Sequence, residues 1–343
     1  MDTQIITNPS DQELDMLARA LRNGELVSIP TETVYGLGAN GLDPEAMDKI
    51  YTAKGRPSDN PLILHVPNSE SIKPLVTEVS NTAQLLMDTF WPGPLTITLP
   101  KSDLVPDRAT GGLPRVALRC PDHELCRALL ERAGVPIAAP SANISGRPSP
   151  TTAQDVYHDM KDRISYILDA GSCTIGVEST VVEVHDDKVI ILRPGGITKA
   201  QLERVVSTVE YDTALVNANT KPKAPGMKYT HYAPDAPMTV VVGSPEGVAS
   251  TFKELSAEVE GPIGCLVSHE TYNLIKEDGR FMCHCFGHHR DALALGHDFY
   301  KSLLHFNENH VTLILAEGVD DDGFGVAIMN RMEKASSHHI IYK

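Results

Sequence analysis

The chain reads Ile29-Pro30-Thr31-Glu32-Thr33-Val34-Tyr35-Gly36-Leu37-Gly38-Ala39-Asn40-Gly41 between a short apolar run at residues 25–28 and a helix start at Asp43. The apolar run predicts a strand, and Asp43 followed by Pro44 predicts the N-cap and first turn of a helix. Hydroxyls and small residues at such a junction suit a site where backbone approaches a polar ligand closely. We therefore expect the glycines to close a tight strand-to-helix turn beside a site.

Two glycine patterns imitate nucleotide-binding fingerprints, and neither has the residues that would complete one. The spacing Gly36-x-Gly38-x-x-Gly41 matches a dinucleotide site, but the acid expected about twenty residues on would be Asp59, which lies in a proline-rich turn. Residues 171–176 have the outer spacing of a P-loop, but Val177-Glu178 stands where Lys-Ser/Thr is needed. We therefore expect neither a nicotinamide cofactor nor a P-loop.

Length and composition are those of an ordinary globular chain with two domains. The chain has 343 residues, of which 41% are hydrophobic, and its 6 cysteines are typical of reduced thiols rather than of a disulfide framework. The first residues lack the basic and apolar segments of a secretory signal, and no apolar run approaches the length of a bilayer span. We therefore expect a cytoplasmic protein that does not associate with membranes.

The formal net charge of −15 is spread along the chain, because residues 237–343 carry 8 Lys and Arg against 15 Asp and Glu. Such acidity argues against a module that follows a nucleic-acid backbone by bulk charge. An anionic ligand must then be held by particular cations.

Apolar periodicity predicts an α/β fold whose first domain covers residues 8–206. It begins with the capping box Ser10-Asp11-Gln12-Glu13 and a helix with one apolar face. Further helices and short apolar strands follow in alternation. The predicted strands are residues 62–66, 95–99, 116–120, 135–139, 164–168, 180–184 and 189–192.

The pattern changes after residue 206. Residues 207–237 show little periodicity and read as an interdomain linker, although Tyr229, His231 and Tyr232 stand among its prolines. Beyond it, strand and helix patterns alternate again, which predicts a smaller Rossmann-like parallel α/β domain over residues 238–343.

One segment of the second domain contains residue types that bind metals, namely Cys283, Cys285, His288 and His289. No second pair of ligands accompanies them, so a strand end followed by loop histidines is the simpler interpretation. The sequence leaves metal binding at this cluster open.

Cations and hydroxyls recur where the predicted elements of the first domain end. Each has a structural explanation by itself, such as a helix-dipole cation or a buried ion pair. Together, with no Cys–His or Ser–His–Asp set and no carboxylate pair, they describe a site that binds anions rather than one that forms a covalent enzyme intermediate. Phosphoryl and nucleotidyl transfer need such positioning and charge neutralisation. The set comprises Lys54, Arg56, Asn60, His65, Arg119, Ser141, Asn143, Arg147, Ser149, Ser179 and Arg193.

Six ordered motifs resemble those of the YrdC-like threonylcarbamoyl-AMP synthases. They are Pro30-Thr31-Glu32-Thr33-Val34-Tyr35-Gly36-Leu37-Gly38, Lys54-Gly55-Arg56-Pro57 with Asn60-Pro61-Leu62, Trp91-Pro92-Gly93-Pro94, Ala139-Pro140-Ser141-Ala142-Asn143, Gly176-Val177-Glu178-Ser179-Thr180 and Leu192-Arg193-Pro194-Gly195. Residues 224–234 and 325–331 look like the linker and C-terminal domain of the long, two-domain form, so the resemblance covers nearly the whole chain. It implies that the first domain is a YrdC-like twisted mixed sheet with helices.

The resemblance implies an L-threonylcarbamoyladenylate synthase, which is a nucleotidyltransferase. Such an enzyme uses L-threonine, bicarbonate or carbon dioxide, and ATP, and yields threonylcarbamoyl-AMP and pyrophosphate for the threonylcarbamoyladenosine modification of tRNA. Magnesium would come with ATP and not from protein ligands. Proteins that transfer the threonylcarbamoyl group would act downstream, so that tRNA is met only indirectly.

The resemblance also implies roles for individual residues. L-threonine would be held by Thr33, His65, Arg119, the backbone at Ala139, and Ser179, with Arg119 as the bidentate partner of its carboxylate. ATP would contact Arg56, Asn60, the backbone of Arg115, Ser141, Ser149, Arg193 and Tyr232, the last from a linker that acts as a lid. On physical grounds we add Lys54 and Arg147 as cations that neutralise phosphate, with Lys54 and Arg56 as the catalytic pair, and Asn143 as a residue that orients the phosphate or the Ser141 loop.

Two other functions remain open at this level. Related domains have been interpreted as modules that bind double-stranded RNA or tRNA without catalysis, and others occur inside hydrogenase-maturation proteins. The chain's acidity argues against the first, and the lack of zinc-finger-like and acylphosphatase-like regions argues against the second.

Overall fold

The stretch at residues 29–41 folds in the computed structural model as part of a β-hairpin. β2 (Val27–Ile29) pairs antiparallel with β3 (Gly36–Asn40). Helix α2 (Pro44–Lys54) follows, and its predicted N-cap is confirmed because Asp43 accepts a hydrogen bond from the Glu45 amide at 2.9 Å. The structure describes residues 2–215 and 232–343.

The glycines of this stretch serve close packing, and one of them, Gly41, also lies in the predicted strand-to-helix turn. None of the three has a positive φ. A Cβ on Gly38 would lie 3.0 Å from the carbonyl oxygen of Val27, and a Cβ on Gly41 would lie 2.7 Å from Leu64 Cδ2 and 2.9 Å from the carbonyl oxygen of Pro136. Gly36 and Gly38 therefore lie in strand β3, where they let neighbouring backbone approach, whereas Gly41 lies in the predicted turn between β3 and α2.

Two compact units make up the described chain. The first comprises Met1–Ser145, Ser149–Thr174 and Glu178–Tyr229, and the second comprises Gly146–Pro148, Ile175–Val177 and Thr230–Lys343. Each unit has its own sheet, so each is described by itself.

The first unit is built on a mixed sheet, as predicted. Its strand order among the described residues is β1-β8-β2-β3-β7-β4-β6-β5-β9-β10-β11. The β4–β6 and β5–β9 pairs are parallel, whereas the β4–β7 and β5–β6 pairs are antiparallel. The remaining strands are β1 (Gln4–Thr7), β4 (Ile63–His65), β5 (Leu95–Pro100), β6 (Arg115–Arg119), β7 (Ile137–Ala138), β8 (Tyr166–Asp169), β9 (Thr180–Val184), β10 (Val189–Arg193) and β11 (Val209–Tyr211).

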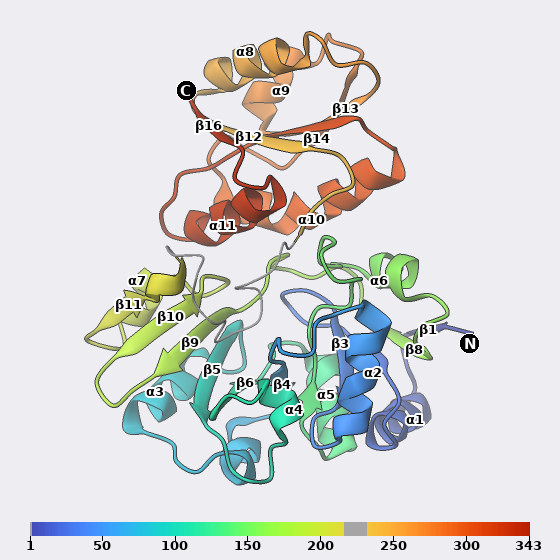
Figure 1. Ribbon diagram of the computed structural model, residues 1–343, viewed down its shortest axis with the longest axis vertical. Coiled ribbons are helices and arrows are strands. Elements are labelled where there is room, and N and C mark those ends of the chain that lie inside the picture. The colour runs from blue at the N-terminus through green and yellow to red at the C-terminus, as the bar shows by residue number, and fades with distance from the viewer. Residues whose placement is uncertain (1, 216–231) are drawn as a thin grey trace. The chain divides into compact units, whose positions relative to one another are not determined.

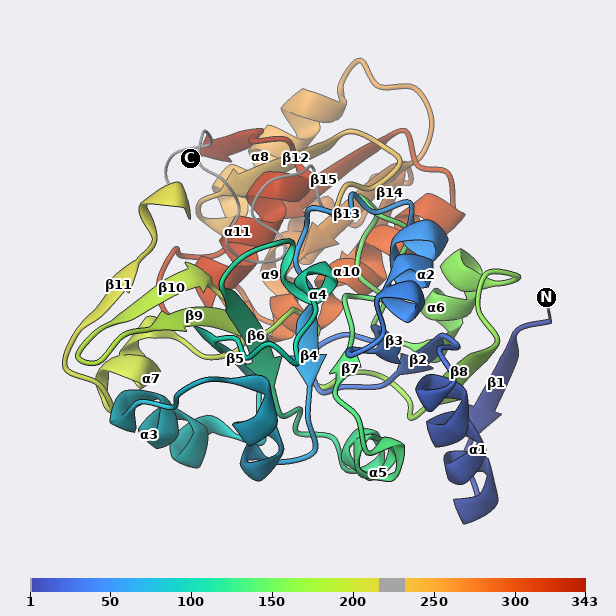
Figure 2. The same ribbon diagram turned by 60° about the horizontal axis from the view of Figure 1, so that its bottom comes forward.

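Helices cover both faces of this sheet. They are α1 (Asp11–Arg22), α3 (Asn81–Phe90), α4 (Asp107–Thr110), α5 (Glu124–Ala133), α6 (Ala153–Met160), α7 (Lys199–Glu203) and the 3-10 helices η1 (Ser69–Leu75) and η2 (Thr213–Leu215), besides α2. α1 and α5 lie side by side (Figure 2) and bury Leu17 and Leu129 in one core cluster. α2, α3 and α6 bury Met47, Leu86 and Val156 in the other, which places the sheet between two apolar layers.

The segment predicted as a linker begins with regular structure. β11 lies at the edge of the first sheet and pairs in parallel with β10, so that Val209 stands opposite Val189. Only Val209 of its three residues is buried, which explains why the apolar pattern did not predict this strand. The later part of the linker, including Tyr229 and His231, lies outside the described residues.

The second unit is a parallel α/β sheet, as predicted. Its strand order among the described residues is β14-β13-β15-β12-β16, and every pair is parallel. Figure 1 shows α8 and α9 on one face of this sheet and α10 and α11 on the other. The elements are β12 (Met238–Val242), α8 (Pro245–Ser256), β13 (Ile263–Val267), α9 (His269–Ile275), β14 (Phe281–Cys285), α10 (Ala292–Glu308), β15 (Leu313–Glu317), α11 (Gly325–Ala335) and β16 (Ile340–Tyr342).

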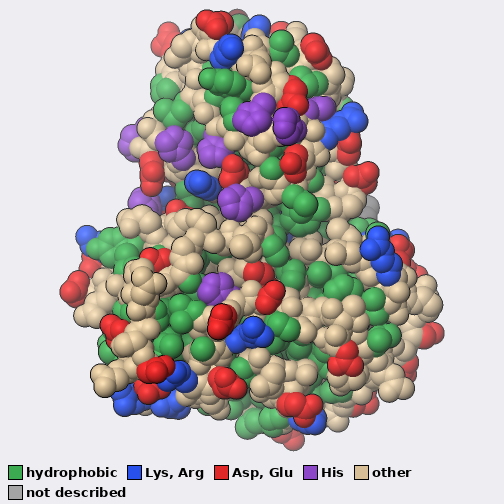
Figure 3. All heavy atoms as spheres, turned by 180° about the vertical axis from the view of Figure 1, so that it is seen from behind, with side chains coloured by type: hydrophobic (Ala, Val, Ile, Leu, Met, Phe, Trp, Pro, Cys, Tyr) green, Lys and Arg blue, Asp and Glu red, His purple; other side chains and the backbone are tan. Residues whose placement is uncertain are grey.

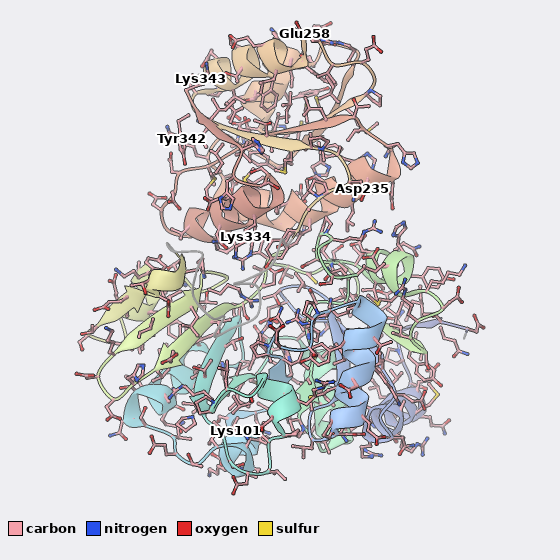
Figure 4. The ribbon with its side chains drawn as sticks, in the orientation of Figure 1. Lys101, Asp235, Glu258, Lys334, Tyr342 and Lys343 are labelled. Carbon is pink, nitrogen blue, oxygen red and sulfur yellow. The ribbon has the colours of Figure 1, made fainter. Side chains whose placement is uncertain are left out.

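β16 forms one edge of the second sheet. Figure 4 shows Tyr342 and Lys343 at this edge and Glu258 beyond the end of α8, and the Tyr342 side chain is exposed. No helix within residues 2–215 and 232–343 combines the length and the apolar character that crossing a bilayer requires.

The close approach at Gly41 gives a stability prediction. We expect Gly41→Ala to lower the free energy of unfolding of the first unit by about 1–3 kcal/mol, because the new methyl group meets a backbone oxygen that cannot rotate away. Gly36→Ala is the matched control with a smaller cost, because its nearest neighbour would be a side-chain atom, Ala139 Cβ, at 3.1 Å. Urea unfolding followed by the fluorescence of Trp91, the single tryptophan, measures both variants. Equal costs at the two glycines would contradict the packing argument.

Candidate functional site

Two predicted site residues end neighbouring parallel strands. His65 is the last residue of β4 and Arg119 the last of β6, and the two stand opposite each other in register. The strands therefore deliver an imidazole and a guanidinium to one edge of the sheet. Burial and, to a lesser degree, the nearby charge of Arg119 lower the pKa of His65 to about 3. His65 is consequently neutral at neutral pH and acts as a hydrogen-bonding group rather than a cation.

Arg119 is buried and held from three directions. Its Nη1 donates to Thr33 Oγ1 at 3.0 Å, and its Nε donates to the carbonyl oxygen of Gly93 at 3.3 Å. Its Nη2 lies 2.7 Å from Glu32 Oε1 in an ion pair whose side chains are 5% and 7% exposed. The guanidinium thus joins the stretch at residues 29–41 to the loop before β5.

Residues 139–143 lie beside the stretch at residues 29–41. The Ala139 amide donates to the carbonyl oxygen of Ile63 at 3.0 Å, and the Leu37 amide donates to that of Pro140 at 2.7 Å. Gly36 and Ser141 form an isolated antiparallel bridge. Ala139 and Ser141, which we predicted as contacts to different substrates, are therefore fixed to the strands next to Thr33 and His65.

Lys54 fastens α2 to this same loop. Its Nζ, on a side chain that is almost completely buried, donates to the carbonyl oxygens of Ser141 and Asn143, each at 2.5 Å. Burial, with a smaller effect of Arg56, lowers the pKa of Lys54 well below its usual value. The side-chain Nδ2 of Asn143 donates to the carbonyl oxygen of Ile144 at 2.8 Å. Lys54 is thus engaged with the protein, so its first role is to position the loop.

Ser179 and Arg193 form a second buried group. Arg193, the last residue of β10, donates from Nε and Nη2 to the Ser179 carbonyl oxygen at 3.1 and 3.0 Å, and from Nη2 to Ser179 Oγ at 3.1 Å. Ser179 Oγ also lies 2.8 Å from Thr96 Oγ1. Predicted contacts to threonine and to ATP therefore touch each other here, which places the two predicted subsites side by side.

Two buried acids belong to this region, and the sequence analysis did not select either. Glu32 pairs with Arg119, and Glu178 Oε1 accepts a hydrogen bond from Ser149 Oγ at 2.7 Å. Glu32 directly precedes Thr33 and Glu178 directly precedes Ser179 within the quoted motifs. This position beside predicted site residues is the sequence signal that could have identified the two acids. The two acids hold other site residues.

Of the remaining predicted ATP contacts of the first unit, Arg115 lines a cavity of ≈ 210 Å³. Its lining includes Pro61, Leu62 and Arg115. Arg56 donates to the carbonyl oxygen of Pro61 at 3.1 Å, and the buried Oδ1 of Asn60 has no hydrogen-bond partner within residues 2–215 and 232–343. The Arg115 side chain donates from Nη2 to the carbonyl oxygens of Thr98 and Val184, both at 2.7 Å.

Arg147 and Tyr232 belong to the second unit. The ring of Tyr232 packs against that of Tyr300 with centroids 5.3 Å apart, and the guanidinium carbon of Arg331 lies 5.7 Å from its centroid. The other predicted contacts belong to the first unit, so the roles of Arg147 and Tyr232 stay predictions.

The cysteine and histidine segment of the second unit was left open as a metal site. Figure 3 shows histidine side chains gathered on one face of this unit. His288 lies 3.2 Å from a Glu270 oxygen and His289 lies 2.7 Å from a Glu317 oxygen, so both rings have carboxylate partners. No group of three or more His, Cys, Asp or Glu side chains within the described ranges is arranged to hold a metal ion.

The first unit's thiols do not supply a nucleophile. Burial raises the pKa of Cys120 to about 11 and raises those of Cys126 and Cys173 still further. Thiols in such surroundings stay protonated and inert. The arrangement of fixed cations, a neutral imidazole and hydroxyls suits the binding of anionic groups and their reaction with one another.

Two family models match consecutive parts of the chain. A family model described as "Telomere recombination" matches residues 19–195, and one described as "Threonylcarbamoyl-AMP synthase, C-terminal domain" matches residues 197–337.

Individual relatives match almost the whole chain. The threonylcarbamoyl-AMP synthase of Bacillus subtilis (strain 168) is 46% identical over 333 residues, which are 97% of this chain and 95% of that protein. The synthase of Pyrococcus abyssi is 44% identical over 332 residues, or 96% of this chain and 95% of that protein. The crystal structure of P. abyssi Sua5 complexed with L-threonine has a TM-score of 0.93 and 42% identity, and covers 99% of this chain and 100% of that one. With two family models and relatives of this identity over both units, the chain belongs to the threonylcarbamoyl-AMP synthases, which are nucleotidyltransferases.

Proposed function

We propose that this enzyme forms threonylcarbamoyl-AMP and pyrophosphate from L-threonine, bicarbonate or carbon dioxide, and ATP. The observation that carries the proposal is the buried Arg119, whose guanidinium is fixed beside Thr33 and the neutral His65. Such a group is suited to an amino-acid carboxylate. The P. abyssi relative whose structure matches was crystallised with L-threonine.

L-threonine is proposed to bind at Thr33, His65, Arg119, the Ala139 backbone and Ser179. Arg119 takes the carboxylate, because its Nη2 is a buried donor with an ion-pair partner but no hydrogen bond among the described residues. His65 and the hydroxyls offer neutral hydrogen-bonding groups for the side-chain hydroxyl and the amine.

ATP is proposed to bind at Arg56, Asn60, the Arg115 backbone, Ser141, Ser149 and Arg193, with Asn143, Arg147 and Tyr232 as further contacts. The cavity beside Arg115 is lined by apolar side chains including Leu62 and Leu113, which suits the adenine ring. Arg56 and Arg193 supply positive charge for the phosphates.

The proposed reaction needs positioning and no enzyme nucleophile. The threonine amine adds to carbon dioxide to give a carbamate, and a carbamate oxygen attacks the α-phosphorus of ATP while pyrophosphate leaves. Magnesium is proposed to enter with ATP on its phosphate oxygens, and the two buried acids of the site are already engaged by Arg119 and Ser149. No step of the mechanism relies on a protein ligand for the metal.

The proposal extends to the cellular location of the enzyme and to the proteins that use its product. We infer a cytoplasmic enzyme, in line with 6 free cysteines, whose product passes to proteins that modify tRNA. The division into a catalytic domain at residues 8–206, a linker at 207–237 and a further domain at 238–343 likewise stays a proposal.

The activity assay decides between catalysis and simple binding. We expect the purified chain to release pyrophosphate from ATP only when L-threonine and bicarbonate are both present, as measured by a coupled phosphate assay. Reactions that lack either substrate are the controls. Binding of double-stranded RNA or tRNA without this release would favour the binding module.

Replacement of Arg119 tests the threonine subsite. We expect Arg119→Ala to raise the KM for threonine about tenfold or more and to change the KM for ATP much less, because a hydrogen bond to a charged group contributes about 1.5–3 kcal/mol. Arg119→Lys, which keeps the charge but loses the planar fork, is the control and has an intermediate effect. Equal changes in both KM values would remove Arg119 from the threonine subsite.

We expect Lys54→Ala and Arg56→Ala to lower activity alike but to differ in their effect on stability. Either alanine variant lowers kcat at least about tenfold, which corresponds to about 1.4 kcal/mol at the transition state. Lys54→Ala also lowers the melting temperature, because it frees the carbonyl oxygens of Ser141 and Asn143, whereas the half-buried Arg56 can be removed with little effect on folding. Thermal unfolding and steady-state kinetics of both variants measure this difference. An unchanged kcat in both would show that the two cations serve only the helix end.

A further inference from the structure

Glu32 is a buried acid whose single close partner of opposite charge in the structure, among residues 2–215 and 232–343, is Arg119. The two side chains are 7% and 5% exposed, and Glu32 Oε1 lies 2.7 Å from Arg119 Nη2. Neither oxygen of Glu32 accepts a hydrogen bond within the described part of the chain. A charge in such a position is costly unless a partner balances it, so an acid kept there requires an explanation.

The contact balances charge without using the donors of Arg119. The 2.7 Å contact lacks hydrogen-bond alignment, because neither Arg119 Nη2 nor Glu32 Oε1 has a hydrogen bond to any part of the chain that the structure describes. Arg119 is oriented instead by Thr33 Oγ1 and the Gly93 carbonyl oxygen. Its Nη2 therefore keeps its N–H groups for another acceptor, while the charge of the guanidinium is already neutralised.

The threonine subsite consequently has no net charge of its own. Arg119 is the one cation among the five proposed threonine contacts, and Glu32 cancels it. His65 adds no charge at neutral pH, since burial keeps its pKa near 3. Thr33, Ser179 and the Ala139 backbone are neutral.

We propose that Glu32 is a specificity-determining residue that makes this subsite prefer a zwitterionic amino acid over an otherwise similar carboxylate. The inference rests on the proposed function, in which threonine places its carboxylate on Arg119. A carboxylate at that position is repelled by Glu32 at short range and low dielectric. An amino acid offsets the repulsion with its own ammonium group, whereas a hydroxy acid without the amine cannot.

The test compares two ligands that differ in the amine. The dissociation constants of L-threonine and of (R)-3-hydroxybutanoate are measured by calorimetry, with displacement by threonine where the second ligand is weak, on the full-length wild type and on Glu32→Gln. We expect the ratio of the hydroxybutanoate constant to the threonine constant to fall at least fivefold in Glu32→Gln, because the anion gains more than the zwitterion when Glu32 loses its charge. A purely structural role of Glu32 would weaken both ligands together, and an unchanged ratio overturns the proposal.

Matched variants separate the charge of Glu32 from other effects. Glu32→Asp keeps the charge and is expected to keep the wild-type ratio even if both affinities fall. Glu178→Gln makes the same change at the other buried acid of the site, which bonds to Ser149 rather than to Arg119, and is expected to leave the ratio within twofold of wild type. An equal fall in Glu178→Gln and Glu32→Gln overturns the assignment to Glu32. Glu32→Met, a second neutral side chain of similar size, takes the place of Glu32→Gln if that variant does not fold.

The wild-type control separates a failure of the proposed function from a failure of the inference about Glu32. A wild type that neither binds threonine nor releases pyrophosphate contradicts the proposed function. A wild type that binds threonine, together with a ratio that does not move in Glu32→Gln, contradicts the inference about Glu32 alone.

Discussion

The burial of the Arg119 guanidinium is the constraint on which the site depends. Moving an ion of this kind out of water costs several kcal/mol even after the protein relaxes, so its surroundings must compensate for the loss of solvent. Glu32, Thr33 and the Gly93 carbonyl oxygen do so, and they come from two segments separate from β6. The residues that surround the guanidinium are thereby fixed before any ligand arrives.

The sheet register and the loop contacts extend this fixed arrangement. His65 lies beside Arg119 because β4 and β6 are parallel and end together, while the glycines of β3 let residues 139–141 lie close against it. Lys54 then holds the far side of the same loop through two carbonyl oxygens. The side chains that carry the proposed chemistry are therefore positioned by contacts to the protein, which is the condition for electrostatic preorganisation.

The sequence predicted what local chemistry controls. The Ser10 capping box, the Asp43 N-cap and the parallel second sheet follow from cap residues and apolar periodicity, and the structure has all three. β3 was missed because its glycines resemble those of a turn, and β11 because one buried valine gives no period. The cations and hydroxyls of the site could be selected by type, but the pairing of Glu32 with Arg119 joins residues far apart in the chain and exists only in the fold.

Each of the two proposed subsites contains arginine side chains that contacts to the protein hold in place. On the threonine side a single cation is balanced by Glu32, which suits a zwitterion that must give up a proton before its amine can react. On the ATP side Arg56 lies half-buried and donates to the Pro61 carbonyl oxygen, and Arg193 donates to the Ser179 carbonyl oxygen. Their charge can then act on phosphate, where the substrates carry most of their negative charge and where the pyrophosphate must leave. Ser179, a proposed threonine contact, accepts hydrogen bonds from Arg193, a proposed ATP contact, so the two proposed subsites meet at this residue.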